Sequence, residues 1–280
     1  MKRLIFVFSF LALVLTVSSM TGVVRATSAE AAVQTIEVSN AREFLEALGS
    51  NRIIEMDYSG DYNLSKWEFS DDLTLPAGVR WEGVFDGAEL VLSGINNLTI
   101  NGGGPDGANS RIIVDPRYAF VMKFENCSDI VINGPWAGHS VGGSCEGGVF
   151  GFTDSSRITI SYTEMYGCGT EGLTLSNVSD MKVAHSVISN CTYYIMTVTG
   201  GANISFENCM FAHNQEYTLV NVSGTRNMSF TDCDFYSNRG EMFNVNSTTV
   251  TVSNSLFNRN VTGYPIQDSL NVEFKNCEFK

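Results

Sequence analysis

The chain has 280 residues, with 30 Asp and Glu against 17 Lys and Arg, and a formal net charge of −13 at pH 7. So acidic a chain argues against nucleic acid and against anionic polysaccharides as electrostatically steered partners. Its length fits a single domain behind an N-terminal leader.

The first 31 residues have the pattern of a secretory signal peptide. Lys2 and Arg3 precede an apolar run over residues 4–17, and small residues follow up to Ala31. The apolar run is too short to span a membrane comfortably, and no later stretch reaches spanning length. We therefore expect residues 1–31 to be removed, and the mature protein to be secreted or held at the cell surface without a transmembrane segment.

A short helix is predicted within residues 32–89, which we assign to an N-terminal cap and the first irregular coils. Asn40 and Glu43 have the spacing of a capping box, and Gly49 provides a stop signal. One face of this helix would carry three apolar side chains, namely Phe44, Leu45 and Leu48. Such a helix would cover the open end of the repeats that follow.

Residues 90–280 repeat a short strand pattern in which apolar and outward-facing residues alternate. The first inward residues of these strands are Leu98, Ile130, Ile158, Met181, Ile204, Met228, Val250 and Val272. Their spacing settles to 22–24 residues along the chain. Like residues recur at fixed offsets from each start, so they would stack in columns if each unit were one coil of a solenoid.

Three such columns are predicted. Five residues after each start come small side chains: Thr163, Ser186, Cys209, Cys233, Ser255 and Cys277. Seven after come large apolar ones: Met165, Ile188, Phe211, Phe235, Phe257 and Phe279. Ten after come Cys168, Cys191, Asn214, Asn238 and Asn260. Stacked Asn amides can hydrogen-bond from coil to coil. Cys168 and Cys191 would fall within disulfide range, but we expect free, buried thiols for most of the seven Cys.

These repeats resemble the right-handed parallel β-helix repeats of the pectin-lyase-like superfamily, over roughly residues 90–280. The resemblance implies an all-β fold, a single-stranded right-handed parallel β-helix with about 22–24 residues per coil, and it says little about activity. The polygalacturonase set of Asn-Thr-Asp, Asp-Asp, Gly-His-Gly and Arg-Ile-Lys is not matched, and the Arg-x-Pro-x-x-Arg signature of pectate lyases is missing. A familiar pectinase is therefore not expected.

Two long units place extra residues at 101–110 and 133–148, after the same strand one coil apart. We expect these loops to project side by side, where functional residues often gather. Five side chains there are our candidates for sugar binding or catalysis: Trp136, His139, Glu146, Glu164 and Glu171. Alternatively, Trp136 covers a coil edge, His139 bonds a backbone carbonyl, and the glutamates are solvated.

A second candidate is the outward column thirteen residues after each start, formed by Glu171, Tyr194, Tyr217 and Glu241. Stacked tyrosines flanked by acids would suit sugar rings, although aromatic stacking that only stabilises the sheet explains the tyrosines as well. The two glutamates would be three coils apart, ~14 Å, which is too far for a glycosidase pair at ~5–9.5 Å.

The outward positions of the first strand form a Ser/Thr-rich column without an acid pair. We therefore expect a non-catalytic extracellular module that binds a polysaccharide or a cell-surface glycan, or that forms part of the cell surface. The alternative is a polysaccharide lyase or glycoside hydrolase of an unfamiliar family, with its site in loops 101–110 and 133–148. No metal site and no cofactor are predicted.

The chain stops in mid-coil at Lys280, which predicts a fragment or a subunit contact at an uncapped edge.

Overall fold

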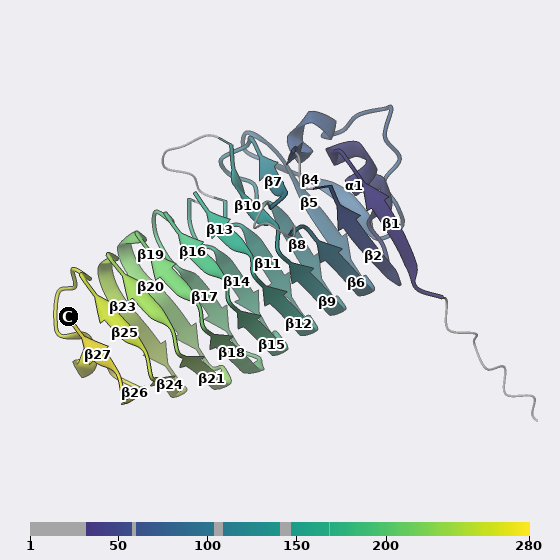
Figure 1. The fold of residues 1–280 in the computed structure, drawn as a ribbon. Helices are drawn as coiled ribbons and strands as arrows, with labels where there is room; N and C mark the ends of the chain where they lie inside the picture. The colour runs from purple at the N-terminus through teal and green to yellow at the C-terminus, as the bar shows by residue number, and fades with distance from the viewer. Residues whose placement is uncertain (1–31, 58–59, 104–108, 141–146, 168) are drawn as a thin grey trace, which may run out of the picture. The chain divides into compact units, whose positions relative to one another are not determined.

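A computed structural model of the protein describes residues 32–280, apart from 58–59, 104–108, 141–146 and 168. Within these residues the chain winds as a parallel β-helix, and successive coils add strands to three sheets (Figure 1). We name them sheets A, B and C. The predicted all-β solenoid is confirmed.

Among the described residues, sheet A has ten strands: β1 (Gln34–Val38), β2 (Arg52–Met56), β6 (Asn96–Asn101), β9 (Ser128–Asn133), β12 (Ser156–Ser161), β15 (Ser179–Ala184), β18 (Ala202–Glu207), β21 (Arg226–Thr231), β24 (Val250–Ser253) and β26 (Val272–Lys275). Sheet B contains β3 (Asp61–Asn63), β7 (Arg111–Val114), β10 (Trp136–His139), β13 (Glu164–Tyr166), β16 (Val187–Ser189), β19 (Met210–Ala212), β22 (Asp234–Tyr236), β25 (Leu256–Asn258) and β27 (Glu278–Phe279).

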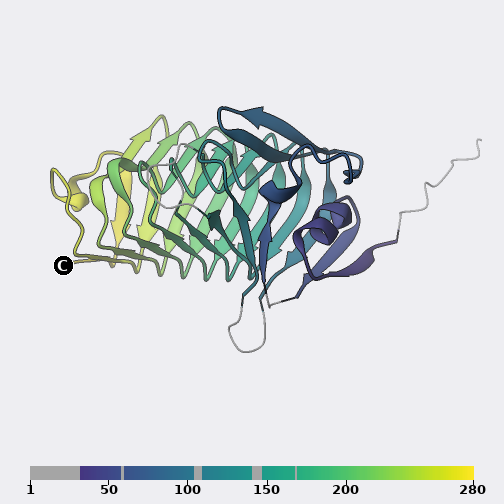
Figure 2. The same ribbon diagram turned by 90° about the horizontal axis from the view of Figure 1, so that it is seen from above.

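Sheet C contains β4 (Val79–Val84), β5 (Gly87–Ser93), β8 (Met122–Glu125), β11 (Phe150–Thr153), β14 (Leu173–Ser176), β17 (Met196–Thr199), β20 (Gln215–Ser223) and β23 (Arg239–Asn246). The helical elements are α1 (Ala41–Ala47) and two 3₁₀ turns, η1 (Leu64–Trp67) and η2 (Ile266–Asp268). Among the strands of the described chain, only β4 and β5 pair antiparallel, as a hairpin at the edge of sheet C (Figure 2).

The predicted strand starts all lie in sheet A and pair in register from Leu98 through to Val272. The sheet also extends beyond the predicted repeats, because Arg52 of β2 pairs with Leu98. Arg52 stands where later strands have an apolar residue, and its guanidinium donates to the carbonyls of Ala47 (2.8 Å) and Leu48 (3.2 Å) at the end of α1. Because of this polar residue, the apolar pattern did not reveal β2 as part of the repeat.

The predicted apolar column forms a stack of phenylalanine rings inside the solenoid. Phe235 lies between Phe211 and Phe257, with ring centroids 4.8 Å and 4.5 Å away. Phe257 in turn stacks on Phe279 at 5.0 Å. These contacts join successive coils through their cores.

The Asn column forms a buried ladder at the corner between sheets B and C. Nδ2 of Asn214 donates to Oδ1 of Asn238 (3.0 Å), and Nδ2 of Asn238 donates to Oδ1 of Asn260 (3.0 Å). The predicted amide column is confirmed.

Cys191 continues the Asn column and is disulfide-bonded, while Cys168 lies outside the described residues. Four thiols are free as predicted, those of Cys127, Cys209, Cys233 and Cys277.

The predicted helix is present as α1, beside β1 at the end of the solenoid opposite the C-terminus (Figures 1 and 2). Asn40 Oδ1 accepts from the Glu43 N–H (3.0 Å). The Glu43 carboxylate accepts from the N–H (2.8 Å) and hydroxyl (2.9 Å) of Ser39, one residue before the partner that a capping box has. The predicted apolar face of Phe44, Leu45 and Leu48 is buried. Its role as a cap of the solenoid stays a prediction.

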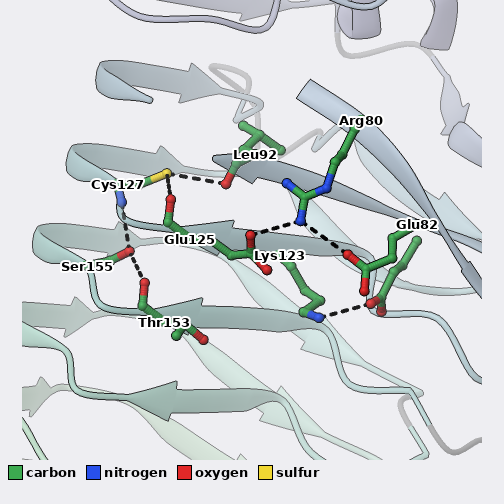
Figure 3. Close-up of polar contacts among 9 residues, drawn as sticks. Arg80, Glu82, Leu92, Lys123, Glu125, Cys127, Thr153 and Ser155 are labelled. Atoms are coloured by element: carbon green, nitrogen blue, oxygen red, sulfur yellow. Dashed lines mark hydrogen bonds and ion pairs between the residues drawn. The ribbon is translucent and has the colours of Figure 1, made fainter. Parts of the chain in front are cut away.

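Ion pairs join the β4–β5 hairpin to β8, the next strand of sheet C (Figure 3). Arg80 of β4 bonds Glu125 of β8 at 2.9 Å, and Lys123 of β8 bonds the buried Glu89 of β5 at 3.0 Å. Arg80 also bonds Glu82 at 3.2 Å. Arg80 and Lys123 each have a carboxylate partner. The cluster therefore links the hairpin to β8, and neither basic side chain is left unpaired to bind a ligand.

Candidate functional site

Trp136 and Glu164, two of the predicted site residues, lie side by side on the outer face of sheet B. Trp136 pairs with Arg111 on one side and with Glu164 on the other, and is 38% exposed. Arg111 forms two hydrogen bonds to the Asp61 carboxylate, each 2.6 Å long. Its charge is therefore compensated, and the surface is an exposed ring beside one carboxylate.

The structure does not bring the other described candidates to this surface. His139 is only 5% exposed, and its Nε2 lies 2.9 Å from the Ala119 carbonyl oxygen. Glu171 is 8% exposed and accepts a hydrogen bond from the Thr174 hydroxyl. Because both are buried, they share no open cleft with Glu164. Glu146 lies outside the described residues.

Burial also sets the protonation of these two groups. Desolvation lowers the pKa of His139, so the imidazole is neutral at pH 7 and Nε2 donates its proton to the carbonyl. Desolvation raises the pKa of Glu171, against the Thr174 hydrogen bond that lowers it. Neither group is presented to a solvent-borne substrate.

The predicted tyrosines do come together, at the edge where β17 and β20 begin. The Tyr217 ring lies 5.4 Å from that of Tyr193, at an interplanar angle of 23°. It lies 6.3 Å from the ring of Tyr194, at 34°. Tyr217 is 60% exposed, whereas the other two are half-buried. We call Tyr193, Tyr194 and Tyr217 the tyrosine cluster. Tyr193 was missed, although its adjacency to Tyr194 in the sequence was a usable signal.

The predicted register of this column is wrong at Tyr217. Thr218, and not Tyr217, pairs with Glu241, and the pairing of β20 with β23 shifts between Gln215 and Thr218. An extra residue therefore interrupts β20, and Glu216 has φ +93°. A bulge of this kind bends the strand and re-aims a side chain. Here it accompanies the outward placement of Tyr217.

Glu241 connects the tyrosine cluster to the loop 259–271. Its carboxylate accepts from the Thr218 hydroxyl (3.3 Å) on one side and from the Tyr264 hydroxyl on the other. Exposed rings beside a hydrogen-bonded carboxylate can stack on a sugar ring and accept from its hydroxyls.

An open groove of ≈ 520 Å³ runs over sheet A and was not predicted. The second residue of each sheet A strand from β6 to β21 has left-handed backbone, with φ between 55° and 58°: Asn97, Asp129, Arg157, Asp180, Asn203 and Asn227. Arg157 is unusual there, because Asn and Asp tolerate this conformation best. Its guanidinium bonds the Asp129 carboxylate at 2.7 Å and 2.8 Å, so its charge is satisfied within the protein.

The family described as right handed beta helix region matches residues 122–230 and 196–280, together more than half of the chain. The chain belongs to the right-handed beta helix family. The predicted resemblance to the pectin-lyase-like superfamily is confirmed by this match and by the fold of a solved pectate lyase. The sequence matches no curated protein.

The solved pectate lyase is Bsp165PelA from Bacillus sp. N165, in complex with trigalacturonate. The fold of this chain matches it with a TM-score of 0.50 and 14% identity, over 89% of this chain and 82% of that chain. Polygalacturonase from Erwinia carotovora ssp. carotovora has a TM-score of 0.39 and 12% identity, over 89% of this chain and 93% of that one. Alginate lyase from Paenibacillus sp. str. FPU-7 has a TM-score of 0.38 and 9% identity, over 88% and 99%. Identities this low show the fold alone.

Two absences hold for the described residues of this beta helix protein. No group of three or more His, Cys, Asp or Glu side chains is placed there to hold a metal ion. In the same residues, no helix is long and apolar enough to cross a membrane.

Proposed function

We propose that this protein is a secreted, non-catalytic β-helix module that binds glycans through the tyrosine cluster. The observation that carries the proposal is the bulge in β20, which places Tyr217 outward against Tyr193 and Tyr194. Tyrosine rings offer an apolar face for the C–H side of a sugar ring, and their hydroxyls remain available for hydrogen bonds. Secretion rests on the leader pattern of residues 1–31.

The backbone around the bulge supports a role beyond sheet pairing. Glu216 has φ +93°, a conformation that typically costs about 1–3 kcal/mol in a residue with a side chain. Opposite it, Gly240 has φ +139°, and a Cβ there would lie 2.3 Å from the Tyr217 carbonyl oxygen. Strands β14 and β17 pair without any register shift, so the fold does not require this strain. Displaying Tyr217 is a sufficient reason for it.

Binding fits the acids of this surface better than hydrolysis does. Glu171 and Glu241 are three strands apart along sheet C, ~14 Å, whereas paired glycosidase carboxylates lie ~5–9.5 Å apart. Glu171 is also buried. Glu241 can accept sugar hydroxyls, but Glu171 cannot act as its partner in acid–base hydrolysis.

The test is a glycan array and a soluble-oligosaccharide titration with the wild type and Tyr217→Ala. Removing the exposed ring should weaken binding about 3–10-fold, because aromatic stacking contributes about 0.5–1.5 kcal/mol beyond area burial. Tyr162→Ala is the matched control, since Tyr162 is 61% exposed and stacks on His185 at 4.9 Å, away from the cluster. Equal losses in both variants, or no loss in Tyr217→Ala, would overturn the proposal.

A polysaccharide lyase or glycoside hydrolase of an unfamiliar family is the second candidate. It is favoured by the exposed Trp136, which belongs to the segment 133–148 and lies beside the Glu164 carboxylate. Its test follows reducing ends and the absorbance of unsaturated products on neutral and acidic polysaccharides. Turnover that is abolished by both Glu164→Gln and Glu146→Ala would replace the binding proposal with this one.

A further inference from the structure

We infer that the tyrosine cluster and a pocket beside Glu241 bind a glycan that carries protonated amino groups, such as a β-1,4-linked glucosamine oligomer. This inference rests on the proposed glycan binding and adds the chemical class of the ligand.

The pocket lies at the end of sheet C. Its volume is ≈ 220 Å³, which suits a single sugar residue rather than a long chain segment. Side chains from β23 and from the loop 259–271 line it: Glu241, Phe243, Asn244, Asn246, Tyr264 and Asp268. Such a lining joins one buried apolar ring to several hydrogen-bonding groups, which is the usual composition of a small-ligand site.

The pocket adjoins the tyrosine cluster, because Glu241 lines the pocket and is bonded to Thr218, the residue after Tyr217. Thr218, which follows Tyr217, donates to the Glu241 carboxylate at 3.3 Å. Tyr264 donates to the same carboxylate from the pocket side. A chain that stacks on Tyr217 and Tyr193 could therefore place its next sugar against Glu241.

The charges around this surface favour a cation. Glu241 and Asp268 line the pocket, and Glu216 is exposed beside Tyr217. The sequence has no Lys or Arg from residue 183 to residue 225, and the whole chain carries −13. Two bases lie on β23 and the loop 259–271: Arg239, exposed at the start of β23, and Arg259 of the loop, which donates to the Tyr236 hydroxyl (3.0 Å). A uronic-acid chain would bring carboxylates against these acids, which costs free energy.

Ammonium groups on the sugar chain would instead find two kinds of partner. Carboxylates accept charge-assisted hydrogen bonds from ammonium groups, and these are stronger than neutral ones. Tyrosine faces attract a cation held within about 6 Å of the ring centroid. Glu241 and Tyr217 supply one partner of each kind at neighbouring positions.

The experiment is calorimetric titration of the full protein with two hexasaccharides, β-1,4-linked glucosamine and its fully N-acetylated counterpart. They share length and linkage and differ in charge. We expect the glucosamine hexamer to bind at least tenfold more tightly at pH 6, and added salt to reduce this preference. Glu241→Gln should remove most of the preference while keeping the acceptor for Tyr264. Glu37→Gln, which changes an exposed acid on β1, should leave the preference intact.

The pH dependence gives a second readout. The preference should fall at high pH, where the sugar amine loses its proton. Equal affinity for the two hexamers, with Tyr217-dependent binding of both, would overturn this inference and leave the proposed function standing. Binding of neither hexamer would also overturn this inference, whereas glycan binding that Tyr217→Ala does not weaken would overturn the proposed function as well.

Discussion

Asn238 is enclosed at the corner between β22 and β23, and both ends of its amide are bonded. Its Nδ2 donates to the Phe211 carbonyl (2.8 Å) and to Asn260 (3.0 Å). Its Oδ1 accepts from the backbone N–H and from Nδ2 of Asn214, both at 3.0 Å. One side chain thus satisfies polar groups of three successive coils, and those of Phe211 and Asn214 are buried.

Asn238→Ala should therefore destabilise the fold strongly. It would leave the buried Asn214 N–H without its acceptor, and this unpaired group would cost about 1–3 kcal/mol. Denaturant unfolding of the variant measures this change. The control is Asn244→Ala, which truncates an exposed Asn on β23. A similar loss in both variants would contradict the importance of the ladder.

The small-residue column predicts opposite outcomes for two nearby substitutions. Cys209→Ser should be tolerated, because Ser186 in the same column already donates to the carbonyl two residues before it (2.9 Å), as the Cys209 thiol does (3.4 Å). Phe235→Ala should cost about 3–5 kcal/mol, since it empties a buried position in the ring stack. Thermal melts that reverse this order would show that the inferred register is wrong.

Glu171 should make the stability of the protein depend on pH. Its pKa is raised in the fold by burial, so the folded state favours the protonated form. Its favourable contribution is complete below the ordinary carboxyl pKa of ~4.3 and is lost as pH rises through the raised value. Glu171→Gln, which can still accept from Thr174, should raise the melting temperature at pH 7.5 and change it little at pH 4. An equal gain at both pH values would contradict this assignment.

At the scale of the elements, the bulge in β20 is the feature on which the proposed site depends. Gly240→Ala would place a Cβ 2.3 Å from the Tyr217 carbonyl oxygen. We expect the variant to melt at a lower temperature and to lose the Tyr217-dependent glycan binding. Gly224→Ala is the matched control, because Gly224 also has positive φ (+67°) but has open space around it. Binding should survive there, and a loss of binding in both variants would exclude a specific role for the bulge.

Much of the β-helix followed from the sequence because like residues occupy like offsets. Side chains such as Ile204 and Phe211 pack against their counterparts in the next coil, so stacking selects a visible period. The extra residue of β20 was invisible, since it changes the spacing by one while the flanking columns stay in register. A pattern of this kind cannot say at which residue a strand accommodates an insertion.

The predicted convergence of Trp136 and His139 failed for a simpler reason. They stand three positions apart on the single strand β10, where successive side chains point to opposite faces. Trp136 therefore faces solvent and His139 faces the core. This alternation of faces was not used in the prediction, because the Gly-rich sequence after residue 139 indicated a loop and not a strand.

At the scale of the molecule, the solenoid separates its structural and its binding tasks. Columns of Phe and Asn inside each coil stabilise contacts with the neighbouring coils, so that stability is close to a sum over coils. The outer faces are then free to differ. The groove over sheet A, the Trp136 surface on sheet B and the tyrosine cluster on sheet C are three separate places where a glycan could bind.

Crystal structures of the protein soaked with the glucosamine hexamer and with its N-acetylated counterpart distinguish these three places directly. Our account predicts sugar density over Tyr217 and Tyr193, with the chain intact and an adjoining residue against Glu241. Density confined to the sheet A groove beside Arg157, or to the surface at Trp136 and Glu164, would contradict it. A shortened chain in either place would show that the protein is an enzyme.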